Sequence, residues 1–590
     1  MRREKNVRWA IGSVLPLLLA AEGFTQIVLW EQVGPPPPYG PFPQSLFPGK
    51  FHAGGDVNGD GIRDVGAGAP TVSTGATYGH GQAWVYSGAD GTVLYTVIGT
   101  GAWAAVGSAV LVPGDLDGDG HSEFVTNAVG GTGMSYGPGP VAVFSGADGS
   151  LLYTVPGLRV GWSPLEVMDQ NGDGVPDLVL GCHSCGPAST PAAGAVAVVS
   201  GVDGSSLQYW TTTLFFPAFT RYGFSVANVG DMHGDGTDDL IVGAPKFVNP
   251  TNVLETALSY AQVRSGADGA VYYTLFPNPP VASLNQRFGW SVAGGDLDMD
   301  GIPDLIVGRV VPGMTPPLLP GHSVFSGATG QLFRATEDFA GEVVRFLGDV
   351  DGDGFNDYLG GSIFIDPATM SNCVSVGGGT GCGRVDIFSG REGTVIMTLR
   401  RPGSGEFGHY AAVAGDVDGD DIPDVAVGDP SYPLIGLPKP GRLTMFSLRP
   451  VGVEVYGAGC AGALPQVPRI GVRGSPSLGA VVKVNLSKAA PAAPAILFLG
   501  LSNSAWGPTP LPLDLAPFGM PGCSLLAAAD FAFPFVTYPV PPAPGRASME
   551  WTIPGNPSLV GGQVFCQWIV LGGPGLAGSA LTRGVRLQVF

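Results

Sequence analysis

Acidic residues at alternate positions recur in short segments along the chain. In the first segment, DVNGDGIRD, Asp56, Asn58 and Asp60 lie two residues apart and Asp64 follows four residues later. Ca²⁺ takes about six to eight oxygen ligands, and short loops supply them from alternate positions. Glycine at the sixth position permits the sharp turn that would fold the chain around an ion. The segment therefore predicts a calcium loop.

The pattern Asp-x-(Asp/Asn)-x-Asp-Gly-x-x-Asp occurs seven times with small variations. Positions 1, 3, 5 and 9 offer side-chain oxygens, and position 7 offers its main-chain carbonyl. The predicted ligands are Asp56, Asn58, Asp60, Ile62 and Asp64; Asp115, Asp117, Asp119, His121 and Glu123; Asp169, Asn171, Asp173, Val175 and Asp177; Asp231, Asp235, Thr237 and Asp239; Asp296, Asp298, Asp300, Ile302 and Asp304; Asp349, Asp351, Asp353, Phe355 and Asp357; and Asp416, Asp418, Asp420, Ile422 and Asp424.

Two loops depart from the pattern. His233 occupies position 3 of the fourth loop and is a poor calcium ligand, so we expect a weak or water-filled site there. Asp421 replaces the glycine at position 6 of the seventh loop. Asp tolerates left-handed backbone better than most residues, so we expect that site to be kept.

Charge also favours a bound cation over a solvated polar turn. The ligand positions hold 25 of the 48 carboxylates in a chain of net charge −20. Carboxylates packed this closely repel one another without a counter-ion. We expect up to seven structural Ca²⁺ ions, with Mg²⁺ disfavoured by its tighter octahedral geometry. Catalysis by these acids is not expected, because every loop carries the same set and no pair stands out.

The surrounding sequence keeps the same period. Successive loops begin 53 to 67 residues apart, with an apolar run before each loop and further runs after it. Turns of SGADG type begin at Ser87, Ser145, Ser200, Ser265, Ser326 and Ser389. Each unit thus contains four short strands, which is the content of one propeller blade. These repeats resemble the FG-GAP repeat family, which builds the seven-bladed propeller of integrin α subunits. The resemblance covers roughly residues 45–448, and it implies an all-β, seven-bladed propeller whose A–B loops bind calcium.

The seventh repeat lacks an SGADG turn, because Phe446-Ser447 runs directly into LRP. A closed ring needs a fourth strand for this blade, since an unpaired edge would otherwise remain. We expect Gln26–Glu31 to supply it from the N-terminal side, with Arg449–Tyr456 as the competing donor.

The two ends of the chain differ from the repeats. Residues 1–23 have a basic start and an apolar run too short to span a bilayer, which predicts a secretory signal peptide and a secreted or cell-surface protein. Residues 24–450 then form the propeller, and residues 451–590 are predicted to form a small β-sandwich domain. No segment has the length and apolar purity of a transmembrane span.

Cysteine usage agrees with export to an oxidising compartment. In the C-terminal region we expect Cys460 to pair with Cys523 and Cys566 to remain free. Cys182 and Cys185 lie close enough for a small disulfide in a loop. Cys373 and Cys382 form a second close pair.

The leading functional hypothesis is a calcium-binding propeller that binds a protein or glycan ligand, for example in adhesion. The acidic net charge disfavours nucleic acid as a partner. The ligand is expected on the face opposite the calcium loops, which carries the long B–C connections Thr71–Gly81, Ala128–Pro140, Cys182–Gly194, Lys246–Tyr260, Val311–Gly321, Gly361–Gly383 and Ser431–Gly441. One alternative is a polysaccharide lyase or hydrolase, which needs His, Lys, Arg or Tyr residues converging on the axis, and the sequence indicates no such cluster. A structural envelope protein is the other alternative.

Overall fold

Strands form nearly all of the regular structure. The computed structural model describes residues 26–34, 47–48, 50–73, 79–101, 104–127, 140–155, 165–185, 193–212, 220–245, 259–278, 287–310, 321–336, 341–362, 383–401, 406–430, 441–540, 544–572 and 576–590. These ranges contain two 3₁₀ turns, η2 (Ala516–Phe518) and η3 (Pro557–Leu559), and no helix long and apolar enough to cross a membrane. The predicted signal peptide, the pair Cys373 and Cys382, and most of the B–C connections lie outside them.

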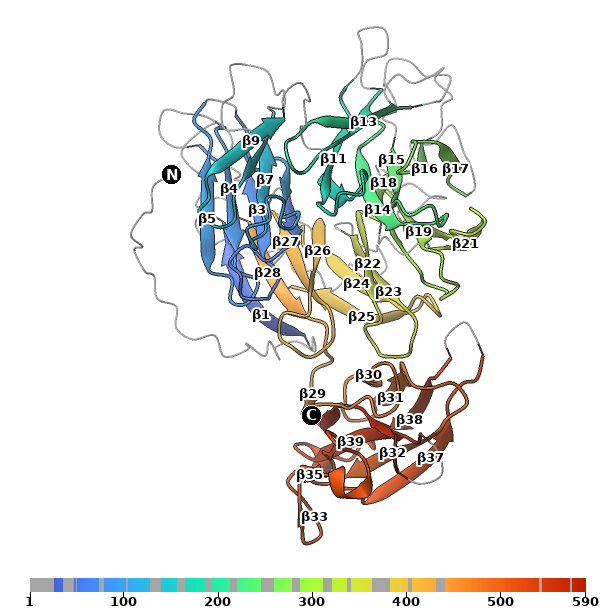
Figure 1. Cartoon of the computed structure of the whole chain (residues 1–590). Coiled ribbons are helices and arrows are strands. Elements are labelled where there is room, and N and C mark those ends of the chain that lie inside the picture. The colour runs from blue at the N-terminus through green and yellow to red at the C-terminus, as the bar shows by residue number, and fades with distance from the viewer. Residues whose placement is uncertain are drawn as a thin grey trace.

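Seven four-stranded antiparallel sheets form the blades of a propeller (Figure 1). In blades one to three the strands are β2 (Phe51–Ala53), β3 (Val65–Ala69), β4 (Gln82–Tyr86) and β5 (Val93–Ile98); β6 (Val110–Leu111), β7 (Phe124–Asn127), β8 (Val141–Phe144) and β9 (Leu151–Val155); and β10 (Leu165–Met168), β11 (Asp177–Cys182), β12 (Ala195–Val199) and β13 (Ser206–Thr211).

Blades four to seven repeat the arrangement. Their strands are β14 (Ser225–Gly230), β15 (Asp239–Ala244), β16 (Tyr260–Arg264) and β17 (Val271–Leu275); β18 (Phe288–Gly295), β19 (Asp304–Arg309), β20 (Gly321–Phe325) and β21 (Leu332–Ala335); β22 (Val343–Gly348), β23 (Asp357–Ser362), β24 (Arg384–Phe388) and β25 (Val395–Arg400); and β26 (Tyr410–Gly415), β27 (Asp424–Asp429), β28 (Arg442–Ser447) and β1 (Ile27–Val33). The predicted all-β, seven-bladed fold is confirmed.

The burial of each strand explains the apolar runs in the sequence. The second strand of every blade is buried along its whole length, because neighbouring blades cover both of its faces. Outer strands such as β9 and β21 expose most of their side chains. Between blades the backbones come very close: a Cβ atom on Gly68 would lie 2.0 Å from the carbonyl oxygen of Gly107. Glycine is therefore required at such contacts.

The ring is closed by strand exchange between the two ends of the repeat region. β1 pairs antiparallel with β28, from Ile27 opposite Ser447 to Val33 opposite Arg442. The N-terminal donor is thus confirmed. The competing donor, Arg449–Tyr456, is wrong, because β29 (Val453–Tyr456) instead pairs with β41 (Gly584–Gln588) in the C-terminal region.

Outer strands also link blades to their neighbours through the SGADG turns. Trp30 of β1 is 3% exposed, and its indole N–H donates to the carbonyl oxygen of Gly88 at 2.6 Å. A Cβ atom on Gly91, the last residue of that turn, would lie 2.8 Å from the Trp30 ring. The final glycine therefore serves two purposes, since its φ of 72° needs glycine and its missing side chain leaves room for the ring. Tyr153 makes the equivalent hydrogen bond to Gly201.

The C-terminal region contains two main sheets. One has the order β29-β41-β39-β32-β37 with β40 beside β39, and the other has the order β30-β31-β38. Their bounds, with those of two short hairpins, are β30 (Arg469–Arg473), β31 (Val481–Ser487), β32 (Pro494–Gly500), β33 (Ala505–Trp506), β34 (Thr509–Pro510), β35 (Leu513–Asp514), β36 (Ser524–Leu525), β37 (Phe531–Val536), β38 (Ala547–Thr552), β39 (Gln563–Val570) and β40 (Ala580–Leu581). Val484 from one sheet and Trp568 from the other share one buried core, as expected for a β-sandwich.

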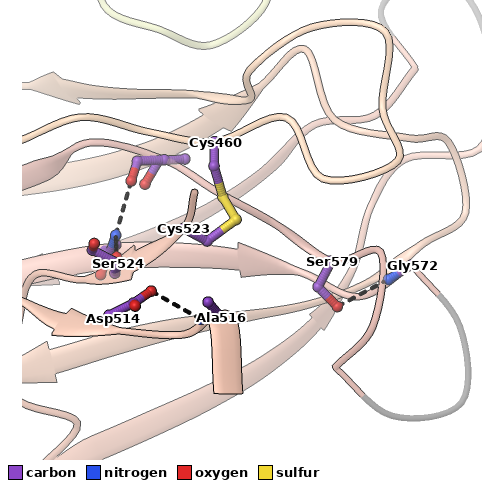
Figure 2. The surroundings of a disulfide bond; sticks show 9 residues. Cys460, Asp514, Ala516, Cys523, Ser524, Gly572 and Ser579 are labelled. Carbon is purple, nitrogen blue, oxygen red and sulfur yellow. Dashed lines mark hydrogen bonds between the residues drawn. A yellow bond between two sulfur atoms is a disulfide. The ribbon is translucent and has the colours of Figure 1, made fainter. Parts of the chain in front are cut away.

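The predicted cysteine chemistry is confirmed where the structure describes it. Cys460 is bonded to Cys523, linking the start of this region to the β36 hairpin (Figure 2). Cys182 is bonded to Cys185 in the loop after β11. Cys566 lies on β39, is fully buried and carries a free thiol.

Replacing Trp30 tests the closure of the ring. The change Trp30→Ala removes a buried ring and its hydrogen bond, so we expect the free energy of unfolding to fall by about 3–5 kcal/mol. Val33→Ala at the exposed end of β1 is the matched control and should change it by about 0.5 kcal/mol or less. Urea unfolding followed by fluorescence measures both. Equal stability of the two variants would contradict a closing role for Trp30.

Candidate metal centres

The seven acidic loops connect the first and second strands of the blades and share one set of hydrogen bonds. In each loop the N–H at position 6 donates to the position 1 carboxylate, over 2.6–3.0 Å. The N–H at position 7 donates to the position 5 carboxylate, over 2.8–3.0 Å. Local bonds of this kind are what short acidic side chains form in turns. The seven loops are therefore copies of one structure.

The carboxylate at position 9 ties the loop to its blade in five of the seven repeats. Asp64 is fully buried, and its Oδ2 accepts the N–H of Val57 at 2.7 Å. Its Oδ1 accepts the N–H of Gly88, in the SGADG turn, at 2.9 Å. The same carboxylate-to-turn bond occurs in blades three to six, through Asp177, Asp239, Asp304 and Asp357. The acidic loops and the SGADG turns thus lie on one face, as the sequence predicts.

Several buried carboxylate oxygens in the loops have no hydrogen-bond donor among the described residues. They are Glu123 Oε1, Asp349 Oδ1, Asp351 Oδ2, Asp353 Oδ2, Asp420 Oδ2 and Asp424 Oδ1. Asp424 has no donor for Oδ1 because blade seven lacks an SGADG turn. Buried polar atoms normally have partners.

The grouping of these oxygens matches the ligand preference of a hard cation. In the second, fifth, sixth and seventh loops, three or four acidic residues each offer an oxygen within 4.8 Å of the others. Such oxygen-only groups suit Ca²⁺. Among the described loops, the donor set therefore fits the predicted ion.

Burial and mutual repulsion make these carboxylates unfavourable as bare anions. Burial, followed by repulsion from Asp418, raises the pKa of Asp424 to about 8. Burial likewise raises the pKa of Glu123 to about 7, and that of Asp64 and Asp304 to about 6. A nearby cation favours the charged form and opposes each of these shifts.

The fourth and seventh loops, which depart from the sequence pattern, differ in whether the ligand geometry is kept. In the fourth, His233 Nδ1 lies 3.3 Å from Asp239 Oδ2, and the ring stacks on Tyr272. The imidazole therefore contacts the carboxylate that the other loops would offer to an ion. In the seventh, Asp421 adopts a left-handed φ of 68°, and its N–H bonds to Asp416 as a glycine would. The backbone of that loop is thus preserved.

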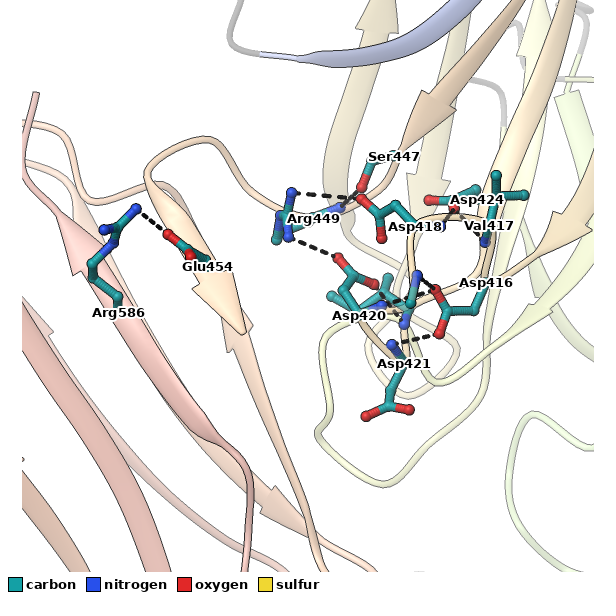
Figure 3. Close-up of polar contacts among 12 residues, drawn as sticks. Asp416, Val417, Asp418, Asp420, Asp421, Asp424, Ser447, Arg449, Glu454 and Arg586 are labelled. Carbon is teal, nitrogen blue, oxygen red and sulfur yellow. Dashed lines mark hydrogen bonds and ion pairs between the residues drawn. The ribbon is translucent and has the colours of Figure 1, made fainter. Parts of the chain in front are cut away.

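Arginines that follow the repeats in the sequence contact the sixth and seventh loops. These contacts were not predictable from the sequence. Arg449 lies 3.5 Å from both Asp418 and Asp420 (Figure 3). Arg469 contacts Asp349 at 3.7 Å, and Arg473 contacts Asp351 at 3.8 Å. Further contacts come from Arg583 to Asp421 and from Asn485 to the carbonyl oxygen of Asp351.

These contacts bury the sixth loop. Asp351 and Asp353 are only 3% and 5% exposed, whereas the corresponding residues of the first loop face solvent. Gly471 of β30 lies against Gly352, and a Cβ atom on Gly471 would be 2.3 Å from the carbonyl oxygen of Asp351. A glycine inside a strand is a sequence signal of such close backbone approach. The sixth loop carries four ligand carboxylates, so one Ca²⁺ and the guanidiniums of Arg469 and Arg473 would together neutralise it.

The propeller axis carries the polar cluster that the sequence analysis does not anticipate. Lys50, His52, Glu166, Arg345 and Tyr410 line one cavity at the axis. The expectation that no His, Lys, Arg or Tyr residues converge there is therefore wrong. Each lies within six residues before the first Asp of an acidic loop, in or beside an innermost strand. Polar residues interrupting those apolar runs were the available signal.

Comparisons with known proteins agree with this geometry. An FG-GAP repeat matches residues 288–309, which span β18, the fifth acidic loop and β19. The chain is 30% identical over 230 residues to "Integrin alpha-5" of Xenopus laevis, covering 35% of this chain and 20% of that protein. It is 28% identical over 214 residues to "Integrin alpha-V" of Gallus gallus, covering 34% and 20%.

A third relative and one solved structure are also similar. "Integrin alpha ina-1" of Caenorhabditis elegans is 30% identical over 179 residues, covering 26% of this chain and 15% of that protein. The chain thus spans about a fifth or less of the length of these relatives. The solved structure described as "Structure of Dos1 propeller" has a TM-score of 0.36 at 11% identity, covering 65% of this chain and 90% of that one. A likeness at that level carries no argument.

The raised pKa values predict an unusual pH dependence for the metal-free protein. The folded state keeps protons on Asp64, Glu123 and Asp424 that the unfolded state releases above about pH 4. The stability that these protons contribute is therefore greatest at low pH and is lost as pH rises toward about 8.

Between about pH 4 and 6.5 the buried His52, His183 and His409, whose pKa burial lowers to about 4, act in the opposite direction, so the net fall is expected above about pH 6.5. We expect the melting temperature after dialysis against a chelator to fall by several degrees across this range. Excess Ca²⁺ should abolish the fall, because the ion stabilises the charged carboxylates. A metal-free melting temperature that rises with pH across the same range would contradict the assignment.

Reversing charge on β30 tests how the C-terminal region is held. The double change Arg469→Glu and Arg473→Glu places new carboxylates against Asp349 and Asp351. Like charges at this distance repel, so we expect the C-terminal region to leave the propeller and the radius of gyration to increase in X-ray scattering. Arg586→Glu, whose partner Glu454 lies within the C-terminal sheet, is the matched control. Unchanged scattering from the double variant would contradict this role.

Proposed function

Because the chain is an FG-GAP β-propeller similar to part of integrin α subunits, we propose that it is a calcium-stabilised binding module for a protein or glycan ligand. An integrin-α-like propeller is typical of a binding or adhesion module in general. The observation that carries the proposal is the sevenfold repetition of one acidic loop on a single face. Identical sites in every blade suit a structural role better than a reaction at one centre.

Calcium ions in these loops would hold the hairpins in place. We infer that the ligands are those named from the sequence, with side-chain oxygens at positions 1, 3, 5 and 9 and the carbonyl at position 7. The orphaned oxygens of Asp349, Asp351 and Asp353 support the sixth site. The contact of His233 with Asp239 supports a weak fourth site.

We place ligand recognition on the face opposite the acidic loops. The acidic face is partly covered, since the C-terminal region contacts the loops of blades six and seven. The opposite face carries the long B–C connections, and binding residues concentrate in loops on a rigid scaffold. We further propose domain bounds of 24–450 for the propeller and 451–590 for the sandwich.

Export to the cell exterior fits this function. The disulfides Cys182–Cys185 and Cys460–Cys523 are typical of an oxidising compartment. We infer that residues 1–23 direct export as a signal peptide. The match to integrin α subunits points the same way.

A calcium-dependent capture experiment tests the proposal. The full chain is immobilised and exposed to a glycan array and a panel of extracellular proteins, with Ca²⁺ or with chelator, while its melting temperature is recorded. We expect saturable capture that needs Ca²⁺, and a higher melting temperature with Ca²⁺. One site filled at about 100 times its Kd adds about 2.7 kcal/mol of stability.

Matched loop variants separate the sites. Asp60→Asn should lose part of the calcium stabilisation, whereas Asp90→Asn, in the exposed part of the SGADG turn, should keep it. An identical melting temperature with and without Ca²⁺ would refute the structural role of the ion. Capture of no ligand by a calcium-loaded, folded protein would refute the binding role.

A further inference from the structure

A cavity of about 260 Å³ lies on the axis of the propeller. It is lined by the innermost strands of all seven blades, β2, β6, β10, β14, β18, β22 and β26, or by residues that directly precede them. Most lining side chains are apolar or small, such as Val226 and Ala412. A cavity with apolar walls and a few convergent polar groups is the usual form of a small-molecule site.

The charges in this cavity do not balance. Lys50 and Arg345 are its two fixed cations, and Glu166 is the one carboxylate among its lining residues. Neither cation forms an ion pair within the described ranges. Lys50 Nζ lies 4.9 Å from the centre of the Tyr410 ring, and Arg345 donates to the carbonyl oxygen of Val344 at 2.7 Å. Among the described lining residues the cavity therefore holds an excess of one positive charge, which the nearby Glu342 reduces through its attraction for Lys50.

The lowered pKa values of the basic groups in this cavity indicate that their positive charge is unfavourable there. Burial and repulsion from Arg345, partly offset by attraction from Glu342, lower the pKa of Lys50 to about 8. Burial and the positive charges of Arg345 and Arg63 lower the pKa of His52 to about 4. An anion placed between the cations would relieve both effects.

Hydrogen-bonding groups beside the cations indicate that a ligand of this cavity would also carry hydroxyl groups. His52 Nδ1 accepts the N–H of Val112 at 3.3 Å, so the neutral ring carries its proton on Nε2 and can donate. Glu166 accepts the N–H of Val167 at 3.1 Å and also interacts with the backbone N–H of Asn228, and its carboxylate oxygens keep lone pairs that can accept from a hydroxyl group. The aromatic ring of Tyr410 offers a flat apolar surface along the same wall.

We propose that the axial cavity binds a small hydroxylated monocarboxylate, the size of a single uronic acid, through Arg345 and Lys50. The guanidinium matches a carboxylate with two parallel hydrogen bonds. Glu166 and His52 bind the hydroxyl groups, and Tyr410 packs against the C–H face. A monoanion neutralises the charge of the cavity, whereas a phosphate dianion would give it a net negative charge. The volume suits one sugar residue, since drug-sized ligands occupy about 300–1,000 Å³.

This site goes beyond the proposed function. It lies on the axis, and its described lining residues belong to the innermost strands or directly precede them, apart from the acidic loops. Capture of a macromolecule and binding of a small acid can therefore succeed or fail separately.

Calorimetric titration of the calcium-loaded full chain tests the proposal. The probes are glucuronate, glucose and inorganic phosphate. We expect glucuronate to bind with one-to-one stoichiometry, with glucose and phosphate at least about tenfold weaker, which corresponds to about 1.4 kcal/mol. No saturable glucuronate binding at millimolar concentration would overturn the proposal. Phosphate binding as tight as glucuronate binding would overturn the assignment of a carboxylate.

Variants that are expected to change the affinity in opposite directions distinguish a loss of binding from a loss of folding. Arg345→Gln should weaken glucuronate binding about tenfold or more, and Lys50→Gln should also weaken it. Glu166→Gln should strengthen it, because the change removes the negative charge of the cavity and keeps a hydroxyl acceptor. Lys483→Gln, on β31 of the C-terminal region, is the control and should leave affinity unchanged. Unchanged affinity in Arg345→Gln, or weaker binding in Glu166→Gln, would place the ligand elsewhere.

Discussion

The propeller depends on the buried carboxylate at position 9 of the acidic loops, which in five blades bonds both the loop and the SGADG turn. Asp64 shows its form: one oxygen accepts from the loop backbone, and the other accepts from the turn between the third and fourth strands. One side chain thus fixes both hairpin tips of a blade relative to each other. The same carboxylate is buried away from water and lies close to the other carboxylates of its loop. Because burial and repulsion both disfavour its charged form, the group that fixes the two hairpins also favours a bound cation.

In blade seven, segments from both ends of the repeat region affect the acidic loop. Its fourth strand comes from the N-terminal side as β1, so no turn donor reaches Asp424 Oδ1. Arg449, which directly follows the blade, instead contacts Asp418 and Asp420. Arg469 and Arg473 make similar contacts in blade six. We infer that calcium and the C-terminal region neutralise these two loops jointly, which would couple ion binding to the position of that region.

The repeated features were predictable from sequence because each has a local cause. The hairpin geometry follows from Asp and Gly at fixed spacing, and the left-handed conformation at Asp421 was anticipated for the same reason. The exchanged strand was predictable because a missing SGADG turn leaves a strand unpaired. The contact of Arg469 with Asp349 was not predictable, because it joins residues 120 apart in sequence, one in the sixth acidic loop and one on β30 of the C-terminal region. The axial cluster was missed since Lys50, Glu166 and Arg345 converge only when seven strands surround one axis.

An anomalous-scattering crystal structure of the chain grown with calcium tests the calcium sites most directly. We predict anomalous peaks in the first, second, third, fifth, sixth and seventh loops, each with oxygen ligands at about 2.3–2.6 Å. A weaker peak or none is expected in the loop that contains His233. Folded, closed blades whose loops hold only water at saturating calcium would contradict this prediction, because the buried carboxylates would then be stable without a cation.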